Sequence, residues 1–101
     1  MNQGEIWLFE SVNTKARPAL ILTRPAALAV QRRVTIAGIT TTMRSGPTQL
    51  RLGPDEGLNR ECVANFDDIT VVERSHVTRR LGSLGGRHHE LCAALDALSD
   101  C

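Results

Sequence analysis

Short apolar runs separated by polar turns make up the first half of the chain. Residues 5–9 read Glu-Ile-Trp-Leu-Phe, residues 18–22 are a continuous apolar run that begins with proline, and residues 33–42 are rich in β-branched side chains. Runs of this length and composition are typical of β-strands. We therefore predict strands at these three ranges, with residues 11–16 as a polar loop. Gly38 suggests a bulge or a close backbone approach within the third strand.

The same alternation continues after residue 47. Residues 48–52 alternate polar and apolar side chains, while residues 62–65 and 69–72 are apolar runs with Asn65, Asp67 and Asp68 between them. The polar interruption predicts a bulge or a crossover at that point. Because only the short turn at residues 44–47 separates them, the strands at 33–42 and 48–52 are expected to form an antiparallel hairpin.

Three segments show helical signals. Pro25 stands at a possible first helical position and predicts a short helix or turn over residues 25–30. Ser75 can cap a helical turn running to about residue 80, followed by a loop or edge strand at residues 81–86. A final helix is predicted by an apolar stripe at i, i+4 and i+7, formed by Leu91, Leu95 and Leu98.

This order of elements defines the expected fold class. Strands follow one another with short helices between them and no βαβ rhythm, so we predict a mainly β (α+β) fold with a curled antiparallel sheet or small barrel and a helix packed on its end. A length of 101 residues fits a single domain over residues 1–101. With only two phenylalanines and one tryptophan the core is poor in aromatic residues, which favours a homodimer.

The charge balance limits the kind of partner. Twelve basic and eleven acidic side chains give a net charge of +1, so any nucleic-acid site must be local rather than a strongly basic domain. Lys15 is the only lysine, and the other basic residues are arginines, whose rigid fork suits phosphate. A GC-rich genome, in which arginine replaces lysine in most proteins, would explain the same bias.

Cysteine usage and hydropathy bear on location and on cofactors. Cys62, Cys92 and Cys101 are odd in number and lack CxxC spacing, which favours a reducing cytoplasm. No stretch approaches the roughly 18 apolar residues of a membrane span, and the amino terminus has no basic leader, so no membrane association is expected. His88 and Cys92 are spaced i, i+4 but have no further nearby donors, so neither a metal site nor another cofactor is expected.

Phosphate-binding side chains gather at predicted strand ends. If the third strand pairs antiparallel with the second, the end of the third lies beside the start of the second, and Arg17 meets Thr40 or Thr42. Arg24, at the far end of the second strand, falls on the opposite face. An arginine fork beside a hydroxyl suits a phosphodiester, although threonines are also good strand formers and Arg17 could be a solvated charge. The full group is Arg17, Thr40, Thr41, Thr42, Arg44, Thr48 and Gln49.

Several of these stretches together resemble the MazF/PemK family of toxin endoribonucleases, in particular its compact actinobacterial members. The matching segments, in order, are Gly-Glu-Ile-Trp-Leu at 4–8, Lys-Ala-Arg-Pro-Ala-Leu-Ile-Leu at 15–22, residues 34–42, Gly-Pro-Thr at 46–48 and Asn-Phe-Asp-Asp-Ile at 65–69. The resemblance implies a dimeric, SH3-like barrel of the CcdB/MazF/PemK type that binds RNA in a groove at the dimer interface. The loop at residues 10–16 is shorter than in many family members, which could alter base selection.

The resemblance also implies an activity and its residues. Members cut single-stranded RNA at short sequences without metal, by attack of the ribose 2′-hydroxyl on the adjacent phosphate to leave a 2′,3′-cyclic phosphate. The matching catalytic residues are Arg17 and Thr40. RNA-binding residues are expected at Thr41, Thr42, Arg44, Thr48, Gln49, Asn65 and Asp67. For the general base, the sequence offers only Asp67 or the water around the 2′-hydroxyl.

The family further implies a MazE-like antitoxin as partner, with an acidic disordered tail over the groove. Two other functions fit the same fold: a non-catalytic gyrase poison resembling CcdB, and a relative that only binds an antitoxin. CcdB-like poisons act through a tryptophan-containing carboxyl end, which residues 97–101 lack. The presence of Arg17 and of the threonines argues against an inactive relative.

Overall fold

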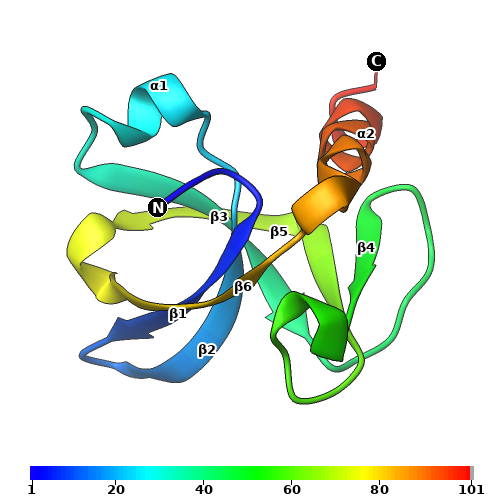
Figure 1. The fold of residues 1–101 in the computed structure, drawn as a ribbon, viewed down its shortest axis with the longest axis horizontal. Helices are drawn as coiled ribbons and strands as arrows, with labels where there is room; N and C mark the ends of the chain where they lie inside the picture. The colour runs from blue at the N-terminus through cyan, green and yellow to red at the C-terminus, as the bar shows by residue number, and fades with distance from the viewer. Residues whose placement is uncertain (101) are drawn as a thin grey trace.

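A strongly curled antiparallel sheet forms the body of the structure, a computed structural model that describes residues 1–100 (Figure 1). Two α-helices and three 3-10 turns accompany its six strands. In chain order the elements are β1 (Glu5–Ser11), β2 (Thr14–Ile21), α1 (Pro25–Leu28), β3 (Arg33–Thr40), β4 (Gln49–Leu52), η1 (Pro54–Glu56), β5 (Cys62–Glu73), η2 (Arg74–His76), β6 (Val77–Ser83), η3 (Gly85–Arg87) and α2 (His88–Leu98).

The strands lie in the order β4-β5-β3-β2-β1-β6, and every neighbouring pair is antiparallel. The predicted mainly β class, with a curled antiparallel sheet and a carboxyl-terminal helix, is therefore confirmed. The antiparallel pairing of β2 with β3 is confirmed as well. Together these elements make a half-barrel with α2 packed against it (Figure 1).

One predicted pairing is wrong. β3 and β4 do not form a hairpin, because β5 lies between them and pairs with both. The twelve-residue β5 replaces the two shorter strands predicted at 62–65 and 69–72, and it offers one edge to all of β3 and the other to the four residues of β4. The segment from residue 41 to 48 is long enough to carry the chain past this strand.

Two segments differ from the expected local structure. The predicted loop at 11–16 is mostly strand, because β1 and β2 continue to a tight turn after the Ser11–Thr14 pair. The predicted helical turn at 75–80 is only the 3-10 turn η2, and the chain then enters β6. The open edge of β1 decides this second case, since it pairs with the backbone of β6. Sheet pairing therefore overrides the capping signal of Ser75.

The two faces of the sheet bury separate cores, as alternation of side chains requires. Leu20, Ala37 and Phe66 belong to the first core, which α2 covers with Leu91 and Ala94. Ile21 and Ile36 point to the other face and belong to the second core, which α1 covers with Leu28. Of the predicted stripe on α2, Leu91 is buried and Leu95 packs against the first core, whereas Leu98 is 40% exposed.

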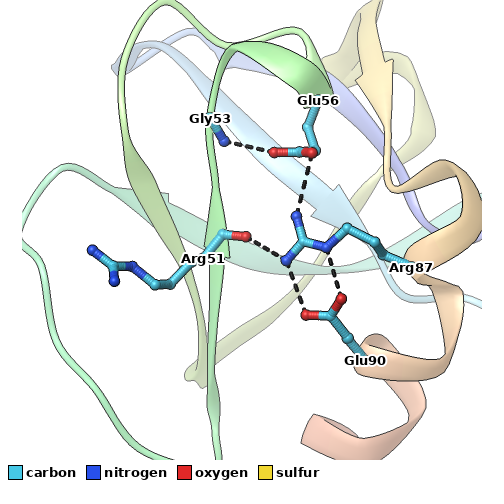
Figure 2. Close-up of polar contacts among 5 residues, drawn as sticks. All are labelled: Arg51, Gly53, Glu56, Arg87 and Glu90. Atoms are coloured by element: carbon cyan, nitrogen blue, oxygen red, sulfur yellow. Dashed lines mark hydrogen bonds and ion pairs between the residues drawn. The ribbon is translucent and has the colours of Figure 1, made fainter.

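Arg87 ties α2 to β4 and to the η1 turn (Figure 2). Its guanidinium donates to both carboxylate oxygens of Glu90 at 2.7 and 2.9 Å and to the Arg51 carbonyl at 2.7 Å. It also lies 3.3 Å from the buried carboxylate of Glu56, which accepts the backbone N–H of Gly53. The hydrogen bond from Arg87 lowers the pKa of Glu90. In Figure 2 the Arg51 side chain extends away from this network.

Candidate active site

The site is built on a row of cross-strand neighbours that spans four strands. Ala19 of β2, Gly38 of β3, Asn65 of β5 and Gln49 of β4 are successive direct partners. Directly opposed residues share a face, and so do residues two apart on one strand. All four side-chain positions therefore lie on the face that, farther along the strands, buries the second core.

A second row lies two residues farther along the strands. Thr40 of β3, Val63 of β5 and Arg51 of β4 are direct partners. Extending the β2–β3 register by two residues from the Ala19–Gly38 pair places Arg17 opposite Thr40. Antiparallel strand geometry thus brings the arginine of the Arg-Pro motif beside the threonine at the end of β3, as the sequence predicts.

These residues surround a cleft of about 410 Å³, here called the Arg17 cleft. Phe9, Ile36 and Ile39 contribute apolar wall, and Phe9 belongs both to the cleft and to the edge of the second core. The polar and charged lining comes from Arg17, Thr40, Thr42, Arg44, Asn65, Asp68 and Thr70. The cleft therefore combines two guanidinium groups with hydroxyl and amide groups in one small volume.

The Thr40 hydroxyl is oriented by the chain that follows it. Its oxygen accepts the backbone N–H of Thr42 at 3.1 Å. Because that bond uses a lone pair of the oxygen, the hydroxyl proton remains available for donation. Thr40 is half-buried and Arg17 is exposed, so a ligand in the cleft can reach both.

A hydrogen-bonded cluster of four predicted residues lies beside the cleft, here called the amide cluster: Thr48, Gln49, Asn65 and Asp67. Gln49 Nε2 donates to Asn65 Oδ1 at 2.8 Å, and the Thr48 hydroxyl donates to Asp67 Oδ2 at 2.9 Å. Asn65 Oδ1 also accepts the backbone N–H of Asp67 at 3.0 Å. A backbone N–H can only donate, so this bond fixes the Asn65 amide with its NH₂ group directed elsewhere.

One buried side-chain atom of the amide cluster lacks a partner. Gln49 Oε1 is buried and accepts no hydrogen bond from the described residues. A buried acceptor without a donor costs roughly 1–3 kcal/mol. The cluster is therefore ordered but not fully satisfied in the free protein.

The interruption of β5 is a bulge, as predicted from the polar residues there. Gly38 pairs with Asn65 while the preceding Ala37 pairs with Ile69, so residues 66–68 have no partner on β3. The bulge buries Phe66 and turns Asp68 into the Arg17 cleft. Among the cleft's charged residues, Asp68 is the one that sequence reasoning did not select. Two adjacent aspartates gave no signal to tell which of them would face the cleft.

Gly38 allows Asp68 to occupy this position. A Cβ atom built on Gly38 would lie 2.4 Å from Asp68 Oδ2. The carboxylate therefore covers the backbone of β3 where any other residue would place a side chain. The predicted close approach at Gly38 is thus confirmed, with a carboxylate as the neighbour.

The other predicted residues differ in whether they line the Arg17 cleft. Arg44 lines the Arg17 cleft and also a neighbouring hollow of about 420 Å³, which includes Gln49 and Arg51. Thr41 is exposed and lines neither cavity. Arg51, which the sequence did not single out, extends the basic surface along β4. Arg24 lines neither cavity, and its carbonyl accepts the first N–H groups of α1.

Residues 1–100 offer neither a metal site nor a membrane-spanning helix. No group of three or more His, Cys, Asp or Glu side chains there is arranged to hold a metal ion. No helix in that range is long and apolar enough to cross a membrane. The Arg17 cleft does offer hydrogen-bond donors for a phosphate group, from Arg17, Arg44 and Thr40. It also offers one carboxylate, from Asp68, which can accept a hydrogen bond or a proton.

Comparison with known proteins gives concordant matches. Residues 2–98 match the family described as PemK-like, MazF-like toxin of type II toxin-antitoxin system. Two relatives from Mycobacterium tuberculosis are named probable endoribonuclease MazF5, 33% identical over 98% of this chain and 93% of the relative, and probable endoribonuclease MazF2, 34% identical over the full length of both. The solved structure of Mycobacterium tuberculosis toxin MazF-mt6 superposes with a TM-score of 0.85 at 31% identity, covering 95% of this chain and 96% of that one.

Proposed function

The chain belongs to the PemK-like, MazF-like toxin family of type II toxin–antitoxin systems, and on that basis we propose that it is an endoribonuclease toxin that cuts single-stranded RNA in the Arg17 cleft. The observation that carries the proposal for the site is the shared cleft of Arg17 and Thr40 on adjacent strands. A guanidinium and a hydroxyl donor at one point can hold both non-bridging oxygens of a phosphodiester.

The reaction proposed is internal transesterification. The ribose 2′-oxygen attacks the adjacent phosphorus, a new 2′-O–P bond forms, and the bond from phosphorus to the 5′-oxygen breaks. The 2′-hydroxyl loses its proton and the departing 5′-oxygen gains one. The products are a 2′,3′-cyclic phosphate and a 5′-hydroxyl, and no water is consumed in this step.

Each catalytic residue has a distinct role in this proposal. Negative charge grows on the non-bridging oxygens as the phosphorus becomes five-coordinate, and Arg17 stabilises that charge with two parallel N–H donors. Thr40 donates a hydrogen bond from its hydroxyl group to one of the same oxygens. Arginine is not a practical proton donor because it stays protonated throughout the ordinary pH range. Its contribution is therefore electrostatic.

Base selection is assigned to the amide cluster and its surroundings. Single-stranded RNA is read through bases that are splayed from the strand and hydrogen-bonded along their edges. The free NH₂ of Asn65 and the second carboxylate oxygen of Asp67 present a donor and an acceptor beside the cleft. Thr41, Thr42, Arg44 and Gln49 complete the proposed RNA-binding surface, with Arg44 between the two cavities.

A MazE-like antitoxin and a second copy of this chain are the proposed protein partners. The family is defined by toxin–antitoxin pairs, and one structural neighbour from a mycobacterial species is described as an endoribonuclease in complex with its cognate antitoxin. An acidic segment of an antitoxin would find Arg17, Arg44 and Arg51 exposed along one face. Occupation of that face would also block RNA, which explains inhibition by competition.

An RNA-cleavage assay tests the function directly. Purified protein is incubated with a long single-stranded RNA in EDTA, and the fragment ends are mapped. We expect cuts at a small set of sequences, with 2′,3′-cyclic phosphate and 5′-hydroxyl ends. Intact RNA would contradict the proposal, and inhibition of gyrase supercoiling by the same preparation would instead indicate a CcdB-like poison.

A further inference from the structure

We propose that Asp68 is the general base of this reaction, taking the proton from the attacking 2′-hydroxyl. The inference rests on the proposed RNA cleavage and adds the group that the sequence leaves unassigned. Four features of the structure carry it: the position of the carboxylate, its free oxygens, the charges that face it and the space between it and the phosphate-binding pair.

The position of the carboxylate follows from Gly38. Asp68 Oδ2 lies 2.4 Å from where a Cβ of Gly38 would be, so it occupies the side-chain place of that residue on the cleft face. Thr40 is the next residue of β3 on this face, about 6.6 Å away along the strand. Arg17, opposite Thr40, is a diagonal neighbour of Gly38 at about 7–8 Å. These strand spacings are wide enough for a phosphate group to lie between the carboxylate position and the positions of Thr40 and Arg17.

That separation suits the reaction. A base must lie about 3 Å from the 2′-oxygen, the 2′-oxygen about 3 Å from phosphorus, and the hydroxyl donor about 3 Å from a phosphate oxygen. Three such contacts in a bent path span a gap of about 7 Å or slightly more. A carboxylate in direct contact with Arg17 or Thr40 would leave no room for the substrate.

The Asp68 carboxylate is free to accept a proton. It makes no hydrogen bond or ion pair with any of residues 1–100, although it lines the cleft. Asp67, the alternative that the sequence offers, differs in both respects. Its carboxylate accepts the Thr48 hydroxyl, and it does not line the Arg17 cleft. The bulge of β5 thus gives the two adjacent aspartates different roles. Asp67 lies where it can contact a nucleobase of the RNA, and Asp68 lies where it can accept the proton of the 2′-hydroxyl.

The charged groups that face Asp68 come from three elements. Arg17 of β2 and Arg44 of the segment after β3 line the same cleft, and Asp67 precedes it on β5. A phosphodiester held by the two guanidinium groups would therefore lie in the same cleft as the Asp68 carboxylate.

In the step itself, an Asp68 oxygen forms a bond to the 2′-hydroxyl proton while the 2′-oxygen uses the released electron pair to bond to phosphorus. The P–O5′ bond breaks and its electron pair goes to the departing oxygen. The proton on Asp68 can then pass to that oxygen through solvent, which restores the carboxylate. Every bond and proton is accounted for without a co-reactant.

The test compares Asp68→Asn with wild type on a short RNA that contains one mapped cleavage site, from pH 5 to 8. Wild-type kcat should be level over this range, because the Asp68 carboxylate rather than hydroxide takes the proton. Asp68→Asn should lower kcat by about 10²-fold or more and remove the plateau, so that the residual rate keeps rising with hydroxide. Asp68→Glu should restore part of the rate and the plateau.

Two further variants separate catalysis from folding and binding. Gly38→Ala keeps Asp68 but forces its carboxylate away from β3. Because the carboxylate is at the end of a flexible side chain, the fold should tolerate this shift, whereas kcat should fall. Asp96→Asn removes the same charge from the exposed surface of α2 and should leave kcat unchanged. An RNA with a 2′-deoxyribose at the cleavage site should bind Asp68→Asn at least as tightly as wild type, because a negative charge is lost.

Wild-type levels of cutting by Asp68→Asn, with the same pH profile, would overturn this inference and leave the endoribonuclease function intact. Weaker binding of the deoxy substrate with an unchanged profile would also overturn it, in favour of a positioning role. Failure of the wild-type protein to cut any RNA would instead contradict the proposed function itself.

Discussion

At the scale of single residues, the two Arg-Pro pairs of the chain have different surroundings. Arg17 lines the same cleft as Thr40, whereas Arg24 precedes α1, with its carbonyl accepting N–H groups from the helix. Their local sequences are nearly the same. The difference arises from their places in the fold. Arg17-Pro18 lies on β2 near the end of β3, whereas Arg24-Pro25 lies after β2, where the chain leaves the sheet and enters α1.

Replacement of Arg17 tests this distinction. Arg17→Ala removes the donor fork that faces the developing phosphate charge, and kcat for RNA cleavage should fall by about 10³-fold. Arg24→Ala, a matched loss of an exposed arginine beside a proline, should keep nearly the wild-type rate. Thermal unfolding of both variants checks the fold. An equal loss of activity in Arg24→Ala would show that the RNA does not lie in the Arg17 cleft.

At the scale of elements, α2 is held to the sheet by both apolar and ionic contacts. Leu91 and Ala94 pack on the first core, and Arg87 bridges Glu90, Glu56 and the β4 backbone (Figure 2). Glu56 is 8% exposed, so its charge depends on this partner. The same arginine fixes the backbone of Arg51, from which a side chain reaches the neighbouring hollow. The helix thus supports the basic surface without lining the Arg17 cleft.

Loss of Arg87 should therefore destabilise the protein. Arg87→Ala leaves the Glu56 carboxylate buried without its ionic partner, and the free energy of unfolding should fall by about 2–3 kcal/mol, less than for a fully buried pair because Arg87 is partly exposed. Urea denaturation followed by circular dichroism measures it. Arg79→Ala, at an exposed position on β6, should change stability by less than about 0.5 kcal/mol. Equal stability of both variants would contradict the anchoring role.

The pH dependence of this anchor has a defined sign. Hydrogen bonding from Arg87 lowers the pKa of Glu90 in the folded state below its ordinary value of 4.5. The stability that this contact contributes is fully present above that value and is lost as the pH falls through the lower, folded-state pKa. Denaturation midpoints of wild type and Glu90→Gln should therefore differ at pH 7 and approach each other as the pH falls through the folded-state pKa of Glu90. A constant difference would show that Glu90 acts by packing alone.

At the scale of the whole molecule, one chain leaves several large apolar side chains in solvent. Val12 is 96% exposed and Val30 is 80% exposed, while Met43, Val71 and Leu98 are each at least 40% exposed. A second copy of the chain could cover apolar surface and close the groove along which RNA would lie.

The expected assembly is a homodimer, with a mass of twice 11.0 kDa in light scattering. Dilution should reveal a cooperative loss of both dimer and RNA cleavage if the groove is shared between the copies. A monomer that retains full activity at every concentration would contradict the proposal. Added acidic antitoxin peptide should compete with RNA without dissociating the dimer.

The sequence by itself determined the local parts of this protein. Alternation and β-branched runs located most of the strands, proline located the start of α1, and the leucine stripe located α2. The Arg-Pro motif and the threonines at the end of β3 were enough to predict that Arg17 lies near Thr40 or Thr42, because antiparallel pairing sets the end of one strand beside the start of the other. The choice of Thr40 came from the resemblance to the MazF/PemK family. These features depend on residues that are close in the chain or on adjacent strands.

Only the tertiary structure decided which distant strands pair and which aspartate enters the cleft. β5 displaces β4 from β3, and β6 forms where the Ser75 cap predicted a helical turn, because open sheet edges are paired across long sequence separations. The bulge opposite Gly38 then turns Asp68, rather than Asp67, toward Arg17. A shift of one residue changes the face of every side chain in a strand, so this choice depends on register, which no local pattern specifies.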